Sequence, residues 1–589
     1  MADTAEPLHV RWLGRVPYRE ALAVQESLFR HGTQNHLLLL EHRHVFTHGP
    51  RADLSVNVLA DPGEVGAELV AVNRGGDVTY HGPGQLVGYP ILSLPPKHGG
   101  QAGPADSVAH VCSVEQLVID ALAELGLSNA GRLDGYPGVW LDGDGAGGRA
   151  PRKICAIGVR VSRGRTMHGF ALNVTTDMRY LRDYIIPCGI ADRPVTSLAE
   201  EGVATSMHEV VDVVARLAAQ RWGSGVERQD VAWLHRPDDL SAFSRGEGPG
   251  QAVRTAADHS AGIAGVAGVA GVAGDPGVAG VAGVAVRLQA RLSSAGVTES
   301  VAIAARKPEW LRPKVHHGAD VLALKKTVRD LNLITVCEEA GCPNLSECWA
   351  DGTATFMVLG ERCTRACGFC LVDTNKPLAP DADEPARVAE AVVRMDLAHA
   401  VLTMVARDDL VDGGMAHVAA CVEAIRLARP ATRIETLISD GKGDPTSLGL
   451  LFRARPDVLN HNMETVPRLQ RAVRPSAGYA RSLSVLAQAK AARLNVKSGL
   501  VVGMGETVTE VDGVLSDLAS IGVDIVTIGQ YLRPTTNHLP VHRWVDPAEF
   551  QRWKVLGESL GIGHVESSPL TRSSYHARQS ADSVSIRTG

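Results

Sequence analysis

The sequence predicts an α/β protein of two consecutive domains joined by a flexible linker. Strand-like apolar runs alternate with helical patterns in both halves of the chain, and a Gly-Val-Ala repeat interrupts this alternation near the middle. The length of 589 residues also exceeds what one hydrophobic core usually accommodates. We therefore expect one domain over residues 1–240, a linker over 241–285 and a second domain over 286–589.

The N-terminal half mixes the two kinds of periodicity. We expect strands over residues 36–42, 86–94 and 153–162, and helices over 111–126 and 208–222. In the C-terminal half, strand candidates alternate regularly with amphipathic stretches. These strands are expected over 400–406, 433–439, 457–464, 495–506 and 524–532, and the helices over 384–395, 419–428 and 479–492. Regular alternation favours parallel strands with crossover helices, arranged as an open or partial barrel.

The segment between the halves is low in complexity. Valine at every third place matches neither the period of a helix nor the alternation of a half-buried strand, so a flexible tether is the simplest interpretation. A membrane span over residues 262–286 is disfavoured, because about a third of that stretch is glycine and Pro276 interrupts it. A collagen-like structure is excluded because the triplets carry almost no proline.

The composition is that of a folded protein with no strong charge bias. Apolar residues make up 45% and charged residues 21%, and the net charge of -6 provides no basic footprint for nucleic acid. The N-terminal stretch MADTAEPLHV lacks the cationic start and apolar run of a secretory signal. We expect a cytoplasmic protein that acts on neither nucleic acid nor membranes.

Six of the ten cysteines crowd between residues 337 and 370. In a reducing compartment such a cluster indicates metal ligation rather than disulfide bonds. Cys363, Cys367 and Cys370 provide three thiolates within one short loop. Tetrahedral structural zinc normally takes four ligands, whereas an iron–sulfur cubane held by three thiolates keeps one iron free. Structural zinc remains the alternative.

The Cys-x3-Cys-x2-Cys spacing, placed directly after the strand-like run ATFMVLG, resembles the motif of the radical SAM superfamily. That resemblance implies a [4Fe-4S] cluster whose free iron binds S-adenosyl-L-methionine, and reductive cleavage that yields a radical able to take hydrogen from unactivated carbon.

A second triplet, Cys337, Cys342 and Cys348, precedes the first. Alone it is ambiguous between a zinc knuckle and disulfides. Before a radical SAM triplet, and followed by RDDLVDGG, NHNMETVPRLQRAVRP, GLVVGMGET and VESSPLTRSSYHA, it resembles the auxiliary-cluster signature of lipoyl synthases over residues 286–578. The resemblance implies a second [4Fe-4S] cluster with Ser574 as its fourth ligand. Judged from the residue type alone, Ser574 would be an ordinary serine whose hydroxyl faces solvent.

The lipoyl synthase resemblance implies sulfur insertion at C6 and C8 of an octanoyl chain linked to a lysine of a carrier domain, with an electron donor such as ferredoxin or flavodoxin. The chain also departs from the family. It has Ser439-Asp440-Gly441 where the family usually has Pro-Asp-Phe, and Met404-Val405-Ala406 where the family often has Ser-Val followed by Asp or Asn. These departures leave the expected cluster ligands in place and weaken residue-level expectations about contacts to the SAM side chain.

The N-terminal half carries a glycine-rich stretch over residues 73–85 that lacks the Gly-Lys-Ser/Thr ending of a P-loop. From its composition alone, this stretch could be a structural loop as readily as a ligand-binding one. With the blocks KICAIGV, HGFALN and IPCGI in this order, residues 8–235 resemble lipoyl(octanoyl) transferases. The resemblance implies a biotin/lipoate ligase-like α/β fold.

Carried over to this sequence, Cys188 is the acyl-accepting nucleophile and Lys153 its activator, since a nearby ammonium favours the thiolate. The alternatives are that Cys188 is an inert buried thiol and that Lys153 is a solvated residue at the end of a strand. Cys155 departs from the family and is expected to be a small core residue. The substrate-binding stretches are expected at Arg74, Gly75, Gly76, Asp77, Val78, Thr79, Tyr80, His81, Ala156, Ile157, Gly158, Gly169, Phe170 and Ala171.

The resemblance further implies octanoyl-acyl carrier protein as donor. The implied acceptors are lipoyl carrier domains of 2-oxoacid dehydrogenase complexes or glycine cleavage H protein. Three alternatives stay open: a fusion in which only one half is active, a scaffold stabilised by metal, and another radical SAM chemistry such as methylthiolation.

Overall fold

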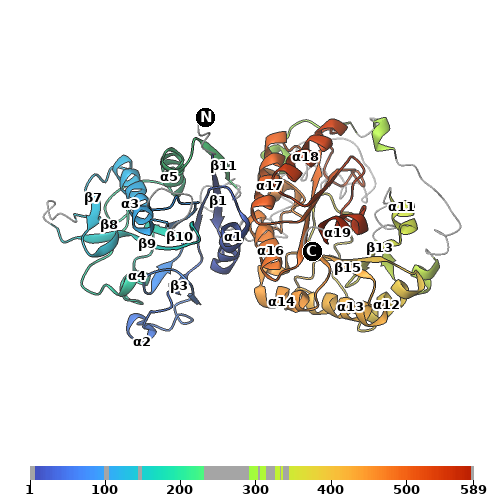
Figure 1. Cartoon of the computed structure of the whole chain (residues 1–589), viewed down its shortest axis with the longest axis horizontal. Coiled ribbons are helices and arrows are strands. Elements are labelled where there is room, and N and C mark those ends of the chain that lie inside the picture. Colours follow the sequence, from blue (N-terminus) through green and yellow to red (C-terminus); the bar gives the residue numbers. More distant parts are fainter. Residues whose placement is uncertain are drawn as a thin grey trace, which may run out of the picture. The chain divides into compact units, whose positions relative to one another are not determined.

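The computed structural model describes residues 7–97, 105–142, 149–230, 291–302, 306–312, 326–331, 333–335 and 344–585. Backbone contacts divide the chain into two compact units, Met1–Ala232 and Trp233–Gly589. In Figure 1 the first unit runs from blue to green and the second from yellow-green to red. The expected linker over 241–285 lies outside the described residues, so the exact domain boundaries stay a prediction.

The first unit is built on an eight-stranded mixed sheet in the order β11-β1-β2-β6-β10-β9-β8-β7. Strand β1 runs parallel to β11 and β2, and the remaining neighbours pair antiparallel. The bounds are β1 Leu8–Arg15, β2 His36–Glu41, β6 Gln85–Ile91, β7 Ala130–Leu133, β8 Tyr136–Leu141, β9 Arg152–Ser162, β10 Arg165–Asn173 and β11 Val226–Asp230. A second sheet has the order β4-β3-β5, with β3 at Val45–His48, β4 at Glu68–Ala71 and β5 at Thr79–His81.

The helices of the first unit cover the large sheet. Helices α3 and α5 pack on each other and on the sheet, side by side in Figure 1. Asp106 caps α3 and Ser206 caps α5 by accepting backbone N–H bonds of the first turn. The bounds are α1 Tyr18–His31, α2 Leu54–Asn57, α3 Ser107–Glu124, α4 Arg179–Arg182 and α5 Met207–Trp222. All five elements expected from the sequence of this half are confirmed, with ends shifted by a few residues.

The second unit is built on a sheet in the sequential order β12 to β19. Strands β13 to β19 each run parallel to the next, and β12 pairs antiparallel with β13 at one edge. The bounds are β12 Ile334–Thr335, β13 Thr353–Val358, β14 His399–Met404, β15 Arg433–Leu437, β16 Val458–Asn460, β17 Asn495–Val502, β18 Ile525–Gln530 and β19 His564–Ser567. The expected partial barrel of parallel strands is confirmed.

Most of the helices connect parallel strands and lie around the outside of the sheet (Figure 1). The last helix, Ala577–Ser585, instead follows β19 and packs its Ala581 and Val584 on Val458 of β16 and Ile525 of β18. The bounds of the helices are α11 Leu345–Ala350, α12 Glu384–Arg394, α13 Met415–Ala428, α14 Pro445–Arg453, α15 Gln470–Val473, α16 Tyr479–Ala491, α17 Val508–Ser520, α18 Pro547–Ser559 and α19 Ala577–Ser585. The strand expected over 457–464 ends early, at Asn460, because the chain turns through a positive φ of 63° at Glu464. None of the described helices is both long and apolar enough to cross a bilayer.

A buried polar cluster lies inside the barrel of the second unit. The Lys497 ammonium is fully buried and lies 3.0 Å from the Glu435 carboxylate, which also accepts from the Asn460 amide at 2.9 Å. His399 lies 3.7 Å from the same carboxylate. Burial alone would raise the pKa of Glu435, yet the neighbouring Lys497 and His399 lower it to about 2. The barrel interior therefore holds a compensated ion pair.

Replacing Lys497 with methionine leaves the Glu435 carboxylate buried without its cation. We expect a loss of about 3–5 kcal/mol in unfolding free energy, measured by urea denaturation of the full chain followed by circular dichroism. The loss shrinks as the pH falls, because burial without Lys497 raises the pKa of Glu435 and protonation then removes the uncompensated charge. Lys490→Met, which breaks a partly exposed pair with Asp524, is the control and costs less than about 1 kcal/mol. Equal costs at the two positions would contradict the prediction.

Candidate functional sites

Cys188 lies in a tight turn that the glycine-rich stretch holds in place. The turn is the 3-10 segment Pro187–Gly189, in which Cys188 has a φ of 56° and Gly189 one of 68°. The Cys188 N–H donates to the Val78 carbonyl at 2.7 Å, and the Ile186 N–H donates to the Asn57 carbonyl at 2.9 Å. A non-glycine residue with positive φ is strained, and such strain is often found at functional sites. The backbone thus presents the Cys188 thiol at a sharp corner.

The structure brings Lys153 to this thiol. The Lys153 Nζ lies 3.7 Å from the Cys188 Sγ, although 35 residues separate them in the chain. Lys153 is 5% exposed, at the start of β9, and its ammonium lies 5.4 Å from the centre of the Trp140 ring. A Cβ on Gly138, whose φ is 119°, would lie 2.6 Å from the Lys153 Cε. Gly138 therefore leaves the room through which the lysine side chain reaches Cys188.

The expected substrate-binding stretches also come together. In the antiparallel register of β9 with β10, the paired residues are Ala156 with Ala171, Ile157 with Phe170 and Gly158 with Gly169. The glycine-rich stretch joins them through the Gly75 N–H, which donates to the Val159 carbonyl at 3.3 Å. A Cβ on Gly158 would lie 3.0 Å from the Gly75 carbonyl, so this close approach depends on glycine. The glycine-rich stretch and the β9–β10 hairpin thus lie side by side, and their role in substrate binding stays a prediction.

Two residues of the glycine-rich stretch direct their side chains into the core. Val78 and Tyr80 are fully buried in an apolar cluster. The Tyr80 hydroxyl lies 2.8 Å from His44 Nδ1, and its ring stacks on Tyr180 with centroids 4.7 Å apart. Val78 reaches the Cys188 turn through its carbonyl instead. Any contact of these two residues with substrate is therefore expected from the backbone.

Arg74 and His81 are two of the buried polar side chains of this stretch, together with Thr79 and Gln85. The Arg74 Nη2 donates to the Thr47 carbonyl at 2.6 Å and to its hydroxyl at 3.0 Å. Burial lowers the pKa of Arg74, and a negative charge at Cys188 would partly offset that effect. Burial also lowers the pKa of His81 well below its usual range, so the His81 imidazole is neutral at pH 7. Arg74 and Lys153 are therefore the cationic groups near Cys188, whereas His81 is neutral.

Cys155 is a core residue, as the sequence analysis expected. It is fully buried on β9, and burial raises the pKa of its thiol to about 12. At neutral pH it is a protonated, inaccessible thiol. The accessible thiol of this site is the partly exposed Cys188.

Cys363, Cys367 and Cys370 lie on the loop that follows β13. The Cys363 Sγ accepts the N–H groups of Arg365 at 3.4 Å and Ala406 at 3.3 Å. Burial raises the pKa of Cys367 to about 12 and that of Cys370 to about 11, and the neighbouring thiols of the triplet add to both shifts. The three donors thus share one loop at the carboxyl ends of the parallel strands, where barrel enzymes place their chemistry.

Soft thiolates on one loop suit an iron–sulfur cluster in their donor chemistry. Within the described ranges, however, no three His, Cys, Asp or Glu side chains come close enough together to hold a metal ion. Cluster ligation by Cys363, Cys367 and Cys370 therefore stays a prediction.

Three contacts hold the far end of this loop. The Gly368 N–H donates to the Val473 carbonyl at 2.8 Å, and the Leu539 N–H donates to the Gly368 carbonyl at 2.9 Å. His538 Nε2 lies 2.9 Å from the Cys370 carbonyl. A Cβ on Gly368 would lie 2.7 Å from the Leu539 side chain, so only glycine lets the loop sit this close. The loop is thereby attached to the segments that follow β16 and β18.

The expected auxiliary ligands are partly visible. Cys337 and Cys342 lie outside the described residues, whereas Cys348 lies on α11 and Ser574 just before α19. The Tyr575 hydroxyl donates to the Glu347 carboxylate at 3.3 Å, and His576 Nε2 lies 3.2 Å from the same group. The neighbours of Cys348 and Ser574 therefore touch across more than 220 residues of sequence. The ligand role of these four residues stays a prediction.

Sequence reasoning missed a group of charged residues at the cysteine loop. Arg365, between the first two cysteines, contacts Asp408 and Asp440. The one sign of this group in the sequence is that Arg365 stands between two cysteines of the motif. A further missed contact joins the Asn462 amide to the Ser573 hydroxyl at 2.9 Å, next to the expected ligand Ser574.

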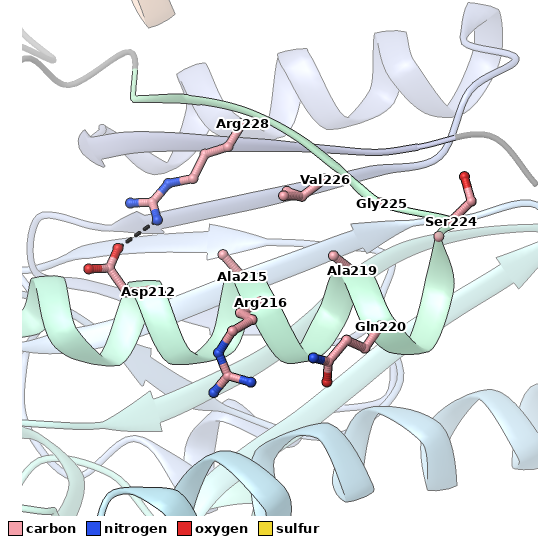
Figure 2. A pocket seen from close by; sticks show the side chains of 10 residues that line it. Asp212, Ala215, Arg216, Ala219, Gln220, Ser224, Gly225, Val226 and Arg228 are labelled. Carbon is pink, nitrogen blue, oxygen red and sulfur yellow. Dashed lines mark hydrogen bonds and ion pairs between the residues drawn. The ribbon is translucent and has the colours of Figure 1, made fainter.

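A pocket on the first unit lies apart from these sites. Figure 2 shows it between α5 and β11, with Asp212 and Arg228 joined across it at 2.5 Å. None of the expected site residues lines it. A smaller pocket in the second unit does contain an expected ligand, and its lining is Glu347, Cys348, Asp351, Thr353, His576 and Gln579.

Replacing Gly138 with alanine places a methyl group where the Lys153 side chain passes. We expect the ammonium to move away from Cys188 and iodoacetamide to alkylate Cys188 several-fold more slowly at pH 7, since the thiolate is the reactive form. Mass spectrometry of the Cys188 peptide over time measures the rate. Gly131→Ala, with nothing within 4 Å of its Cβ, is the matched control. Unchanged alkylation in Gly138→Ala would show that Lys153 does not influence the thiol.

Comparison with known families agrees with the two units. Residues 17–218 match the lipoyl protein ligase A/B catalytic domain. Residues 291–342 match the N-terminal domain of lipoyl synthase, and residues 357–518 match the radical SAM superfamily. The lipoyl synthase of Rubrobacter xylanophilus is 53% identical over 278 residues, which cover 47% of this chain and 87% of that protein. That of Mycobacterium leprae is 52% identical over 272 residues, covering 46% and 87%.

Among solved structures, a bipartite lipoate protein ligase from Thermoplasma acidophilum is 19% identical, with a TM-score of 0.32, and the match covers 40% of this chain and 90% of that one. The hydrogenase maturase HydG of Carboxydothermus hydrogenoformans is 16% identical, also with a TM-score of 0.32, over 52% of this chain and 69% of that one. At these scores neither adds to the assignment. On the family matches and the identities, the chain belongs to the lipoyl synthase family of the radical SAM superfamily through its C-terminal half, and its N-terminal half is a catalytic domain of the lipoyl protein ligase A/B family.

Proposed function

We propose that this chain is a bifunctional lipoylation enzyme of the cytoplasm. Its N-terminal unit transfers an octanoyl group from octanoyl-acyl carrier protein to a lysine of a lipoyl carrier domain. Its C-terminal unit then inserts sulfur at C6 and C8 of that octanoyl chain. The observation that carries the proposal is the 3.7 Å contact between Lys153 and Cys188 in the same chain as the lipoyl synthase cysteine motifs.

The first reaction uses Cys188 as a nucleophile. Its thiolate attacks the thioester carbonyl of the donor, a new carbon–sulfur bond forms, and the carrier thiol leaves and takes up a proton. The acceptor lysine amine then attacks the Cys188 thioester and loses a proton to solvent, so that an amide forms, the carbon–sulfur bond to Cys188 breaks and the thiolate leaves. The Lys153 ammonium stabilises the thiolate before the first step and after the second.

A transferase fits the N-terminal unit better than a ligase does. A ligase activates the free acid with ATP and needs no cysteine nucleophile. Here the chain places a lysine, 5% exposed, within reach of a partly exposed thiol on a strained turn. Such a pair has a use in thioester exchange and none in adenylation.

For the second reaction, the cysteine loop would hold one [4Fe-4S] cluster through Cys363, Cys367 and Cys370. Cys337, Cys342, Cys348 and Ser574 would hold another. When bound, the first cluster and S-adenosyl-L-methionine supply a radical that removes hydrogen from unactivated carbon, and the second supplies sulfide. An oxygen ligand suits soft iron poorly, so Ser574 would detach more easily than a thiolate. An electron donor such as ferredoxin or flavodoxin would reduce the first cluster.

The two reactions are consecutive, because the octanoylated carrier domain made by the first unit is the substrate of the second. Joining them in one chain raises the effective concentration of one active site near the product of the other. The acceptors would be lipoyl domains of 2-oxoacid dehydrogenase complexes or glycine cleavage H protein. The whole series of reactions is tested by giving the enzyme an unlipoylated carrier domain, octanoyl-carrier protein, SAM and reductant. Mass spectrometry of the carrier domain then follows its conversion.

Replacing Cys188 with serine removes the nucleophile while keeping the size of the side chain. Incubation with octanoyl-acyl carrier protein and no acceptor is expected to leave one octanoyl group on the wild-type chain and none on the variant, as measured by intact mass. Cys112→Ser, which changes an exposed cysteine of α3, is the control and keeps the adduct. Full transfer to a carrier domain by Cys188→Ser would refute the nucleophile assignment.

Anaerobic reconstitution with iron and sulfide tests the C-terminal assignment. We expect about eight irons per chain, as two cubane clusters require, with an equal amount of labile sulfide. Cys363→Ala is expected to retain about four, since the auxiliary cluster does not depend on that loop. Bound zinc without labile sulfide would overturn the proposal and favour a structural metal site.

A further inference from the structure

Arg365 lies inside the cysteine motif, two residues after Cys363, and is almost completely buried at 9% exposure. Its guanidinium forms a bidentate pair with Asp408, at 2.7 Å for Nε and 2.8 Å for Nη2. The Nη2 also donates to the Asp440 carboxylate at 2.7 Å. Planar arginine fixes a bidentate partner in both distance and direction. The cysteine loop is therefore oriented by two carboxylates from outside it.

The two carboxylates come from the ends of the next two strands. Asp408 follows β14 and Asp440 follows β15, and Asp440 is fully buried. Lys442 joins them, since its N–H donates to the Asp440 side chain at 3.0 Å and its Nζ donates to the Asp408 carbonyl at 2.9 Å. Arg365 thus connects three successive strand ends, beginning with the loop after β13.

Hydrogen bonds next to Arg365 hold the first thiol of the loop, Cys363. The Thr364 N–H and hydroxyl both donate to the Ala406 carbonyl, at 3.0 Å and 2.9 Å. The Cys363 Sγ accepts N–H groups from Arg365 and Ala406. These contacts hold the Cys363 sulfur beside the segment that leads from β14 to Asp408, the residue that the Arg365 guanidinium binds.

The departure of this chain from the family at residues 439–441 is compatible with the contact. Asp440 is retained, and the residue after it is Gly441, with a φ of 51°. A Cβ at that position would lie 3.1 Å from Met415 and 3.2 Å from Leu448. Glycine at this point lets the chain turn tightly after presenting Asp440 to Arg365.

We propose that Arg365, acting through Asp408 and Asp440, is a positioning residue that shapes the cysteine loop for its cluster before iron arrives. This inference rests on the proposed function of the C-terminal unit. The auxiliary cluster has its expected ligands on other segments, so loss of the Arg365 contacts should affect one cluster and spare the other.

The test is anaerobic reconstitution of the full chain with iron and sulfide, followed by iron analysis and by the change in the EPR spectrum on adding S-adenosyl-L-methionine. Wild type holds about eight irons, and Arg365→Lys, which keeps the charge but loses the bidentate geometry, holds about four and shows no SAM-dependent change. Asp408→Asn/Asp440→Asn is expected to give the same result. Adding Arg365→Lys to that pair should cause no further loss, because all three act as one unit.

Arg543→Lys is the matched control, because Arg543 forms a bidentate pair with Glu549 in the same unit, at 2.5 Å and 2.8 Å, and touches no cysteine of the loop. It is expected to keep about eight irons. Retention of all iron and of the SAM response in Arg365→Lys would overturn the inference, and so would equal loss of both clusters, which indicates misfolding. A wild-type chain that binds no iron would refute the proposed function itself.

Discussion

Parallel pairing of β13 with the strands that follow it is the constraint on which the C-terminal unit depends. Because each strand runs in the same direction as its neighbour, the segments that leave β13, β14 and β15 all emerge at one edge. The cysteine loop, Asp408 and Asp440 meet there for that reason. Below them, the Glu435–Lys497 pair fills the interior with charges that compensate each other. The cysteine loop and its two carboxylates thus lie together at one end of the barrel.

In the N-terminal unit, the candidate site lies instead at antiparallel strands of a mixed sheet. Lys153 lies at the start of β9, where it pairs with Trp140 of β8 on one side and, through an isolated bridge, with Val195 on the other. Cys188 comes from a turn and is fixed through backbone hydrogen bonds to the glycine-rich stretch. Placing one partner on a strand and the other on a strained turn gives both precision and access. Glycines at the points of closest approach, such as Gly138, make the arrangement sterically possible.

Burial separates reactive thiols from inert ones in this chain. Cys155 and Cys188 belong to the same site, yet Cys155 is fully buried and its pKa is raised to about 12, whereas Cys188 is partly exposed beside an ammonium. The thiols of Cys367 and Cys370 are also held protonated by burial, with pKa values raised to about 12 and about 11. Iron would have to displace those protons, since the thiolate is the ligand.

The sequence by itself determined the fold class of both halves, the strands and helices of clearest periodicity, and the family, because apolar periodicity and motif spacing are local properties. It also singled out Cys188 and Lys153 through resemblance. Only the tertiary structure decided that their side chains meet, that Val78 and Tyr80 point into the core, and that Arg365 joins Asp408 and Asp440. Those facts depend on strand register and on the path of turns, which relate residues far apart in the chain and leave no local pattern.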